Sequence, residues 1–394
     1  MNKKLMAVAV AGALTAPAVA MAQSTVQVYG NLYIEYAFTN QKQSASGTGL
    51  TQIDRVDADI LQTGGSAVGF KGEEKLGGGM SAWFQCESTA DPRGASQDGW
   101  CSRNSAVGLK GGFGNFFVGN WDTPFKRTMI NTGGRDTGVF GTSFLLTGGS
   151  TTILDGATEG LFRRRQNNSI NYDSPKFGGF GFMASTTSTN ASTGVTTTSA
   201  QDKERLWSLG AQYAQGPIKI GAGYEQHDKF YPGGGDESGW HVGGSYTFGG
   251  FTLGAQWVSM EADTAPGATA EVDTWHVGAE WKIGGPHALH FGYTKADDME
   301  GTPGAIMGTG ATATRPAVGG PGSTVATGPL RSTSADMFQI RYLYSLSKRT
   351  TASVGYVALK NDDGASYDLG GLNYPATATG AKQDAFAVSI QHRF

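Results

Sequence analysis

The sequence predicts an all-β protein: a 16-stranded antiparallel transmembrane β-barrel with short turns at one end and long loops at the other. Three observations predict this fold. Apolar and polar residues alternate along segments of about ten residues, the length of a tilted strand that crosses a bilayer. Short and long connections between these segments alternate strictly. Beyond the first 22 residues, no apolar run approaches the roughly 20 residues that a membrane-spanning helix needs.

The composition fits a membrane barrel better than a soluble globule. The 394 residues include 61 glycines and 11% aromatic residues, while only 39% are hydrophobic. In a membrane barrel an apolar lipid-facing surface and a polar lumen average to weak overall hydropathy. A secreted β-sandwich would also alternate, but it would not sort its connections so regularly into short and long ones.

The first 22 residues have the features of a secretory signal peptide. Lys3 and Lys4 precede an apolar run over residues 5–19, and Ala20-Met21-Ala22 fits the small-residue cleavage pattern. We therefore expect residues 1–22 to be removed and residues 23–394 to form the barrel. Removal of the two lysines changes the formal net charge from −3 to −5. This mild acidity argues against a nucleic-acid partner, because nucleic-acid-binding domains are usually basic.

The alternation is clear in the segments 26–38, 207–213 and 218–225. In the first of them Val28 and Phe38 share one face, while Gln27, Asn31 and Glu35 share the other. Each segment is therefore predicted to be a strand with one lipid-facing side and one lumen-facing side.

Turn residues divide the chain into sixteen strands, because seven short and eight long connections are found. A barrel of this size encloses an aqueous channel, whereas eight strands would be filled by side chains. The short connections lie at 76–79, 111–114, 175–178, 216–217, 249–250, 284–286 and 347–349. The long ones lie near 39–62, 91–100, 125–162, 188–203, 229–237, 262–270, 298–334 and 361–381.

Several stretches along the whole mature chain resemble the trimeric general porins of the β-proteobacteria. The most specific are the last short turn, Tyr344-Ser345-Leu346-Ser347-Lys348-Arg349-Thr350, and the terminal Ile390-Gln391-His392-Arg393-Phe394. Further matches are the segments 28–33, 68–80 and 168–175.

The resemblance implies a homotrimer in the bacterial outer membrane, in contact with lipid and lipopolysaccharide. It implies a porin function: passive diffusion of ions and small hydrophilic solutes. It also implies that the third long loop, 125–162, folds back into the lumen and narrows it. In this family the last strand is read by the barrel-assembly machinery, so Phe394 is expected to be an assembly signal.

Strand parity supplies candidate constriction residues, because charged rings in a narrow pore set ion selectivity. Lys71 and Arg341 are predicted to face the lumen, and so are Arg163 and Arg165 after the third loop. Asp155 and Glu159 of that loop are the candidate acidic side. The arginines could instead form a solvated loop end or a lipopolysaccharide contact, but the resemblance favours Arg165 as a lumenal residue.

These residues predict a weak preference for anions, set mainly by Arg165. Many relatives carry further lumenal arginines where this chain has Ala67 and Asn104, which argues against strong selectivity. The alternative is a substrate-specific channel with a saturable binding site, in which Tyr29 and Tyr33 form part of a sugar-stacking track.

Cys86 and Cys101 are the two cysteines, and an even pair in a secreted chain indicates a disulfide. Parity places both on outward faces of neighbouring strands joined by the second loop. No catalytic motif, metal site or cofactor site is found: no Gly-x-Ser-x-Gly elbow or phosphate-binding loop occurs. His287 and His290 are three residues apart, so on a strand they would face opposite sides. We therefore expect a protein that is not an enzyme.

Overall fold

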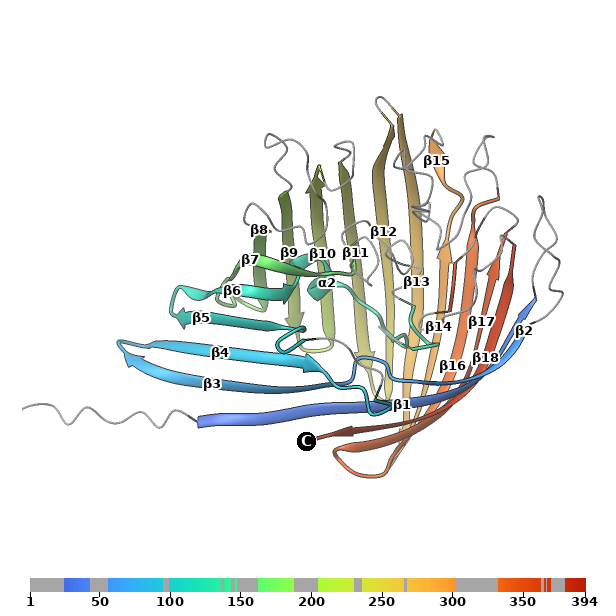
Figure 1. Cartoon of the computed structure of the whole chain (residues 1–394), viewed down its shortest axis with the longest axis horizontal. Helices are drawn as coiled ribbons and strands as arrows, with labels where there is room; N and C mark the ends of the chain where they lie inside the picture. Colours follow the sequence, from blue (N-terminus) through green and yellow to red (C-terminus); the bar gives the residue numbers. More distant parts are fainter. Residues whose placement is uncertain are drawn as a thin grey trace, which may run out of the picture.

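The structure, a computed structural model, describes residues 25–42, 56–94, 99–135, 138–142, 146, 162–187, 205–229, 236–265, 268–301, 332–362, 365, 367–369 and 380–394. These residues form one antiparallel sheet that closes on itself (Figure 1). The closure is made by β1 (Thr25–Lys42), which pairs with β18 (Lys382–Arg393) on one side. On its other side β1 pairs with β2 (Val56–Gln62) and β3 (Ala67–Gly77).

The other strands follow in chain order, and each pairs with its sequence neighbours. They are β4 (Met80–Thr89), β5 (Ser105–Gly111), β6 (Gly114–Asp122), β7 (Arg165–Asp173), β8 (Phe180–Thr187), β9 (Arg205–Gln215), β10 (Ile218–Asp228), β11 (Glu237–Phe248), β12 (Phe251–Ala265), β13 (Ala268–Gly284), β14 (His287–Ala296), β16 (Ala335–Ser345) and β17 (Thr350–Asn361).

Sixteen barrel strands result among the described residues, which confirms the predicted fold. In that count β2 and β3 form a single barrel strand interrupted at residues 63–66, and the short β15 (Glu300–Gly301) only extends the pairing of β13. Closure matters in a membrane because an unpaired backbone group in lipid costs several kcal/mol. All seven predicted short turns lie between strands of the barrel.

Two of the predicted long loops, 39–62 and 262–270, are wrong in their extent. β1 continues to Lys42 and β2 begins at Val56, while only residues 266 and 267 separate β12 from β13. The sequence is polar in both places, but the strands continue to pair there. Asn40 donates to Asp57 over 2.8 Å across β1 and β2. β12 and β13 continue their backbone pairing through Ala262↔Ala270 and Asp263↔Thr269.

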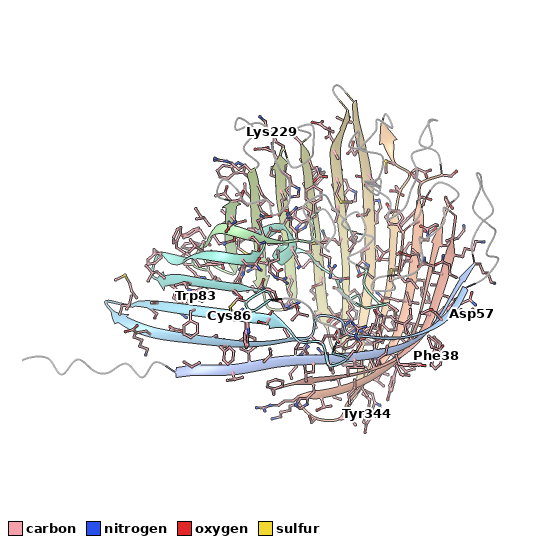
Figure 2. The ribbon with its side chains drawn as sticks, viewed as in Figure 1. Phe38, Asp57, Trp83, Cys86, Lys229 and Tyr344 are labelled. Atoms are coloured by element: carbon pink, nitrogen blue, oxygen red, sulfur yellow. A yellow bond between two sulfur atoms is a disulfide. The ribbon has the colours of Figure 1, made fainter. Side chains whose placement is uncertain are left out.

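The alternation of faces follows the predicted parity along most strands. Val28, Leu209 and Ile220 are among the exposed apolar residues, as are Phe38 and Tyr344, which are labelled in Figure 2. The lumen-facing side chains of the same strands are buried polar groups, such as Glu35 on β1, Ser208 on β9 and Glu225 on β10. The outer band is therefore apolar and the inner wall is polar, as a membrane barrel requires.

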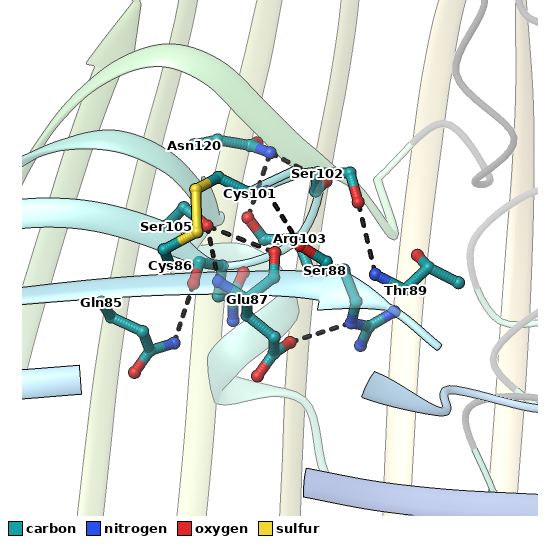
Figure 3. The surroundings of a disulfide bond; sticks show 11 residues. Gln85, Cys86, Glu87, Ser88, Thr89, Cys101, Ser102, Arg103, Ser105 and Asn120 are labelled. Carbon is teal, nitrogen blue, oxygen red and sulfur yellow. Dashed lines mark hydrogen bonds and ion pairs between the residues drawn. A yellow bond between two sulfur atoms is a disulfide. The ribbon is translucent and has the colours of Figure 1, made fainter. Parts of the chain in front are cut away.

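Cys86 and Cys101 form the predicted disulfide, with 4.7 Å between their Cα atoms (Figure 3). Cys86 lies on β4, but Cys101 lies in the connecting loop and not on a strand, because β5 begins only at Ser105. Cys101 has a φ of 58° and donates its backbone N–H to Ser88. With a sequence separation of 15 residues, the chain-entropy model gives a stabilisation of about 3 kcal/mol.

Candidate pore constriction

A short helix, α2 (Pro124–Thr128), starts the segment that enters the barrel. Thr123 caps it by accepting a hydrogen bond from the backbone of Lys126, and Pro124 occupies the first turn, where no donor is needed. α2 lies beside β9 and β10 (Figure 1), and the backbone N–H of Phe125 donates to Ser208 Oγ over 3.0 Å. Among the described residues, no helix is long and apolar enough to cross a membrane.

We call residues 124–135 and 138–142 the third-loop segment. Its backbone is held by side chains that project from the inner wall. Ile130 N donates to Gln256 over 2.7 Å, and Thr132 O accepts from His276 Nε2 over 2.8 Å. Val139 N donates to Glu35 over 3.0 Å. Since these side chains belong to β12, β13 and β1, the segment lies inside the barrel, and the predicted inward fold of the third loop is confirmed.

Three glycines on the inner wall form what we call the glycine seat: Gly221, Gly254 and Gly278. A Cβ at Gly221 would lie 1.9 Å from Thr128 O. A Cβ at Gly278 would lie 1.7 Å from Thr132 O, and one at Gly254 would lie 2.1 Å from Thr132 Oγ1. Every other residue type would therefore push the third-loop segment away from the wall at these positions.

Arg165 lies at the start of β7 in a network of polar side chains. Its Nε donates to Asn104 Oδ1 over 2.9 Å and lies 3.6 Å from Asp122 Oδ1. Asp122 also pairs with Lys126 of α2 at 2.8 Å. One carboxylate thus lies between two cations at the entrance of the third-loop segment.

Arg163 and Arg164 are 5% and 4% exposed, so the structure places both in a buried setting. The alternation expected over 163–171 is interrupted by a β-bulge between β6 and β7, where Asn168 has a φ of 52°. Across the bulge Gln166 is buried and pairs with Trp121. Parity counted from Asn171 therefore does not extend to Arg165. In the sequence, the pair Asn167-Asn168 was the signal for this bulge, because Asn tolerates the left-handed backbone conformation.

Lys71 lies on β3 with its Nζ 5.0 Å from the centre of the Tyr29 ring. Tyr29 donates from its hydroxyl to Glu87 over 3.0 Å. Lys110, on β5, pairs with Glu73 over 2.5 Å. This part of the wall alternates positive and negative groups, so its charges partly cancel.

Arg341 lies on β16 and is 6% exposed. It lines a cavity together with Arg135 of the third-loop segment and His290 of β14. Sequence reasoning missed Arg135, whereas His290 was expected to face the opposite side from His287. The signal for Arg135 was its position as a basic residue within a loop that was already expected to fold inward. Asp155 and Glu159, the candidate acidic side of the constriction, lie outside the described residues.

Phe394 closes the last strand against the first. Its backbone N–H donates to Gly30 O over 3.1 Å, and its carbonyl accepts from Gly30 N over 3.0 Å. The phenyl ring covers Gly30, where a Cβ would lie 2.3 Å from the ring.

Comparisons with known proteins agree with this architecture. The chain is 38% identical to the major outer membrane protein P.IB of Neisseria gonorrhoeae over 116 residues, which is 29% of this chain and only 30% of the length of that relative. It is 26% identical to outer membrane porin protein 32 of Delftia acidovorans over the full length of both chains.

Solved structures show the same fold. The anion-selective porin from Comamonas acidovorans superposes with a TM-score of 0.68 at 22% identity, over 94% of this chain and 100% of that one. OmpT of Vibrio cholerae, in a trimer form, gives a TM-score of 0.62 at 16% identity, over 94% and 99% of the two chains. The family model for Gram-negative porins matches residues 7–364. The chain therefore belongs to the Gram-negative porin family and is a protein of the bacterial outer membrane.

Proposed function

We propose that this protein is a channel through which ions and small hydrophilic solutes cross the outer membrane by passive diffusion. The observation that carries the proposal is the third-loop segment, which is seated inside a closed wall of sixteen strands among charged side chains. A narrowed lumen of this kind selects solutes by size and charge. We propose no enzymatic activity for it.

The channel prefers anions weakly in this proposal, with Arg165 as the main residue and Arg163, Lys71 and Arg341 as further cationic groups. The support is the position of two cations, Arg165 and Lys126, beside the carboxylate of Asp122, and the anion selectivity of the Comamonas porin that shares this fold. Asp155 and Glu159 are proposed to supply the opposing acidic side. Because part of the cationic wall is paired with carboxylates, the preference is expected to be weak.

The functional unit is proposed to be a homotrimer that contacts outer-membrane lipid and lipopolysaccharide and is inserted by the barrel-assembly machinery. The trimer form of the Vibrio OmpT neighbour supports this assembly. Exposed apolar side chains around the barrel supply the surface that lipid or a second copy would cover.

Single-channel recording in a planar bilayer tests the proposal. The purified protein should give stepwise conductance, and its reversal potential under a KCl gradient should indicate a modest excess of chloride flux. A closed barrel that acts only as an adhesin or scaffold would give no steps. A reversal potential that indicates cation flux would refute the anion preference while leaving the channel function intact.

A substrate-specific channel is the second candidate, and it was expected to use Tyr29 and Tyr33 for sugar stacking. One cation lies over each ring: Lys71 over Tyr29, and the guanidinium of Arg135 at 3.6 Å from the centre of the Tyr33 ring. Tyr33 is also only 1% exposed, so it offers almost no open surface to a sugar. This observation favours the general channel.

A further inference from the structure

A cavity of about 330 Å³ lies against the inner wall at β3, β4 and β5, close to the short turns. Such a volume is at the lower end of the range for small-molecule sites. Its lining combines one indole ring, that of Trp83, with the side chains of Lys71, Lys110, Glu73 and Gln85. Ligand pockets of proteins pair an aromatic or apolar surface with a few polar groups in this way. The composition of the lining therefore makes this cavity a candidate solute site within the channel.

Trp83, labelled in Figure 2, lies on the lumen side of β4. Its neighbour Phe84 is 40% exposed on the lipid-facing side, and successive residues of a strand point to opposite faces. On β5, Trp83 pairs with Gly108, which lies between the exposed Val107 and Leu109. Since the Trp83 ring lines the cavity, a solute inside the barrel can reach it.

Trp83 is held in one orientation by its neighbours. Its Nε1 donates to Asn115 Oδ1 over 2.7 Å. Its ring centre lies 5.4 Å from that of Phe117 and 5.7 Å from that of Trp121, both on β6. Gly108 provides the room, because a Cβ there would lie 2.6 Å from Trp83 Nε1. An aromatic surface that is already fixed loses little conformational entropy when a second ring packs on it.

Two ammonium groups and one carboxylate line the cavity beside this ring. Lys110 pairs with Glu73 over 2.5 Å. Lys71 is exposed, and within the described part of the chain it contacts the Tyr29 ring, 5.0 Å away, rather than a carboxylate. An exposed ammonium group of this kind can pair with an anionic ligand. A solute that matches the cavity therefore carries a flat ring and a negative charge.

We propose that this cavity binds aromatic carboxylates, such as a hydroxybenzoate, on their way through the channel. The ring of the ligand packs against the indole of Trp83, and its carboxylate pairs with Lys71. Gln85 donates from its amide nitrogen to Asn104 O over 2.8 Å, so its amide oxygen remains to accept from a ring hydroxyl. The proposal rests on the proposed channel function and adds an internal site for one class of solute. Solutes without a ring pass this site without being retained.

Single-channel current in KCl, recorded with increasing 4-hydroxybenzoate in the bath at neutral pH, tests the site. Binding should lower the current along a saturation curve. The saturated analogue 4-hydroxycyclohexanecarboxylate has the same charge and a similar size but no aromatic ring. Its half-saturating concentration should be several-fold higher, because it cannot form an aromatic pair with Trp83.

Variants of the lining separate the ring contact from the charge contact. Trp83→Leu should raise the half-saturating concentration of 4-hydroxybenzoate about tenfold, the size of effect expected when one stacking contact is lost. It should also abolish the difference between the two ligands. Lys71→Gln should weaken both ligands, because both carry the carboxylate. Trp207→Leu removes an indole that is 45% exposed on the lipid-facing side of β9, so it should change neither value.

The outcomes separate the site from the channel function. Absence of any KCl conductance would refute the proposed function itself. Normal conductance with a current that falls without saturation would overturn the site alone. So would equal half-saturating concentrations of the two ligands in the wild type, or a value for 4-hydroxybenzoate that Trp83→Leu leaves unchanged. If Trp83→Leu yields no folded channel, the comparison of the two ligands in the wild type and in Lys71→Gln decides.

Discussion

At the scale of single residues, Arg165 and Arg341 show how neighbouring groups determine the charge that a passing ion meets. Arg165 shares the carboxylate of Asp122 with Lys126, so its charge is partly compensated. Arg341 faces two other arginines across a cavity that no described carboxylate lines. Two arginines of the same formal charge therefore have different surroundings, and these surroundings determine how much of each charge a passing ion meets.

Replacing Arg165 tests the basic side of the constriction. Arg165→Glu reverses one charge beside Asp122, so the reversal potential under a KCl gradient should move toward cation preference. The shift should be larger at 0.1 M salt, where the Debye length is about 10 Å, than at 1 M, where it is about 3 Å. Arg349→Glu makes the same change in an exposed turn and should have a much smaller effect. An unchanged reversal potential in Arg165→Glu would place this residue off the ion path.

Parity predicted single residues well wherever the strand was regular. Glu35, Ser169 and Asn171 are buried on the inner side as expected. Alternation counted from Asn171 cannot place Arg165, because the bulge at Asn168 interrupts the alternation between the two residues. Its contacts with Asn104 and Asp122 carry that assignment instead. It also missed Arg135, since a loop has no periodicity from which a direction can be counted.

At the scale of elements, the position of the third-loop segment depends on two features of the wall: side chains that form hydrogen bonds to it, and glycines that leave room for it. The wall supplies acceptors and donors at Gln256, His276 and Glu35, and it leaves space at the glycine seat. The turns and strand count could be read from the sequence because turn residues act locally. The glycine seat could not be predicted from the sequence, because glycine is required there by contacts between residues more than 90 positions apart.

A substitution in the glycine seat should loosen the third-loop segment. In Gly278→Val the new side chain would collide with Thr132 O, and overpacking of this kind costs about 1–3 kcal/mol. We expect a larger and noisier single-channel conductance and a lower thermal unfolding midpoint. Ala279→Val is the matched control, because the next residue on the strand points to the opposite face. Wild-type conductance and stability in Gly278→Val would show that the seat does not position the loop.

At the scale of the whole molecule, the pairing of β1 with β18, which we call the seam, closes the sheet into a barrel. β1 pairs with β18 from Asn31↔Arg393 to Lys42↔Lys382, and Phe394 extends that pairing to Gly30. The seam joins the first and the last strand of the sheet, so the barrel cannot close before β18 is in place. The sequence indicated the importance of Phe394 through its resemblance to a family, but not its contact with Gly30, which only the closed structure shows.

Phe394→Ala tests whether this seam controls assembly. The variant keeps the backbone pairing but removes the ring that covers Gly30, so closure of the last strand should be weaker and recognition of the terminal residue should be lost. Export to the periplasm should continue. The amount of folded trimer in the outer membrane should fall by roughly tenfold if the free energy of barrel closure drops by about 1.4 kcal/mol. The trimer is measured as the heat-modifiable band in gels. Phe338→Ala is the matched control, because Phe338 lies on β16, outside this seam, and is 46% exposed, as Phe394 is. If both variants lose trimer equally, the effect is one of lost lipid-facing apolar surface, and a wild-type trimer yield in Phe394→Ala would rule out an assembly role for the terminal residue.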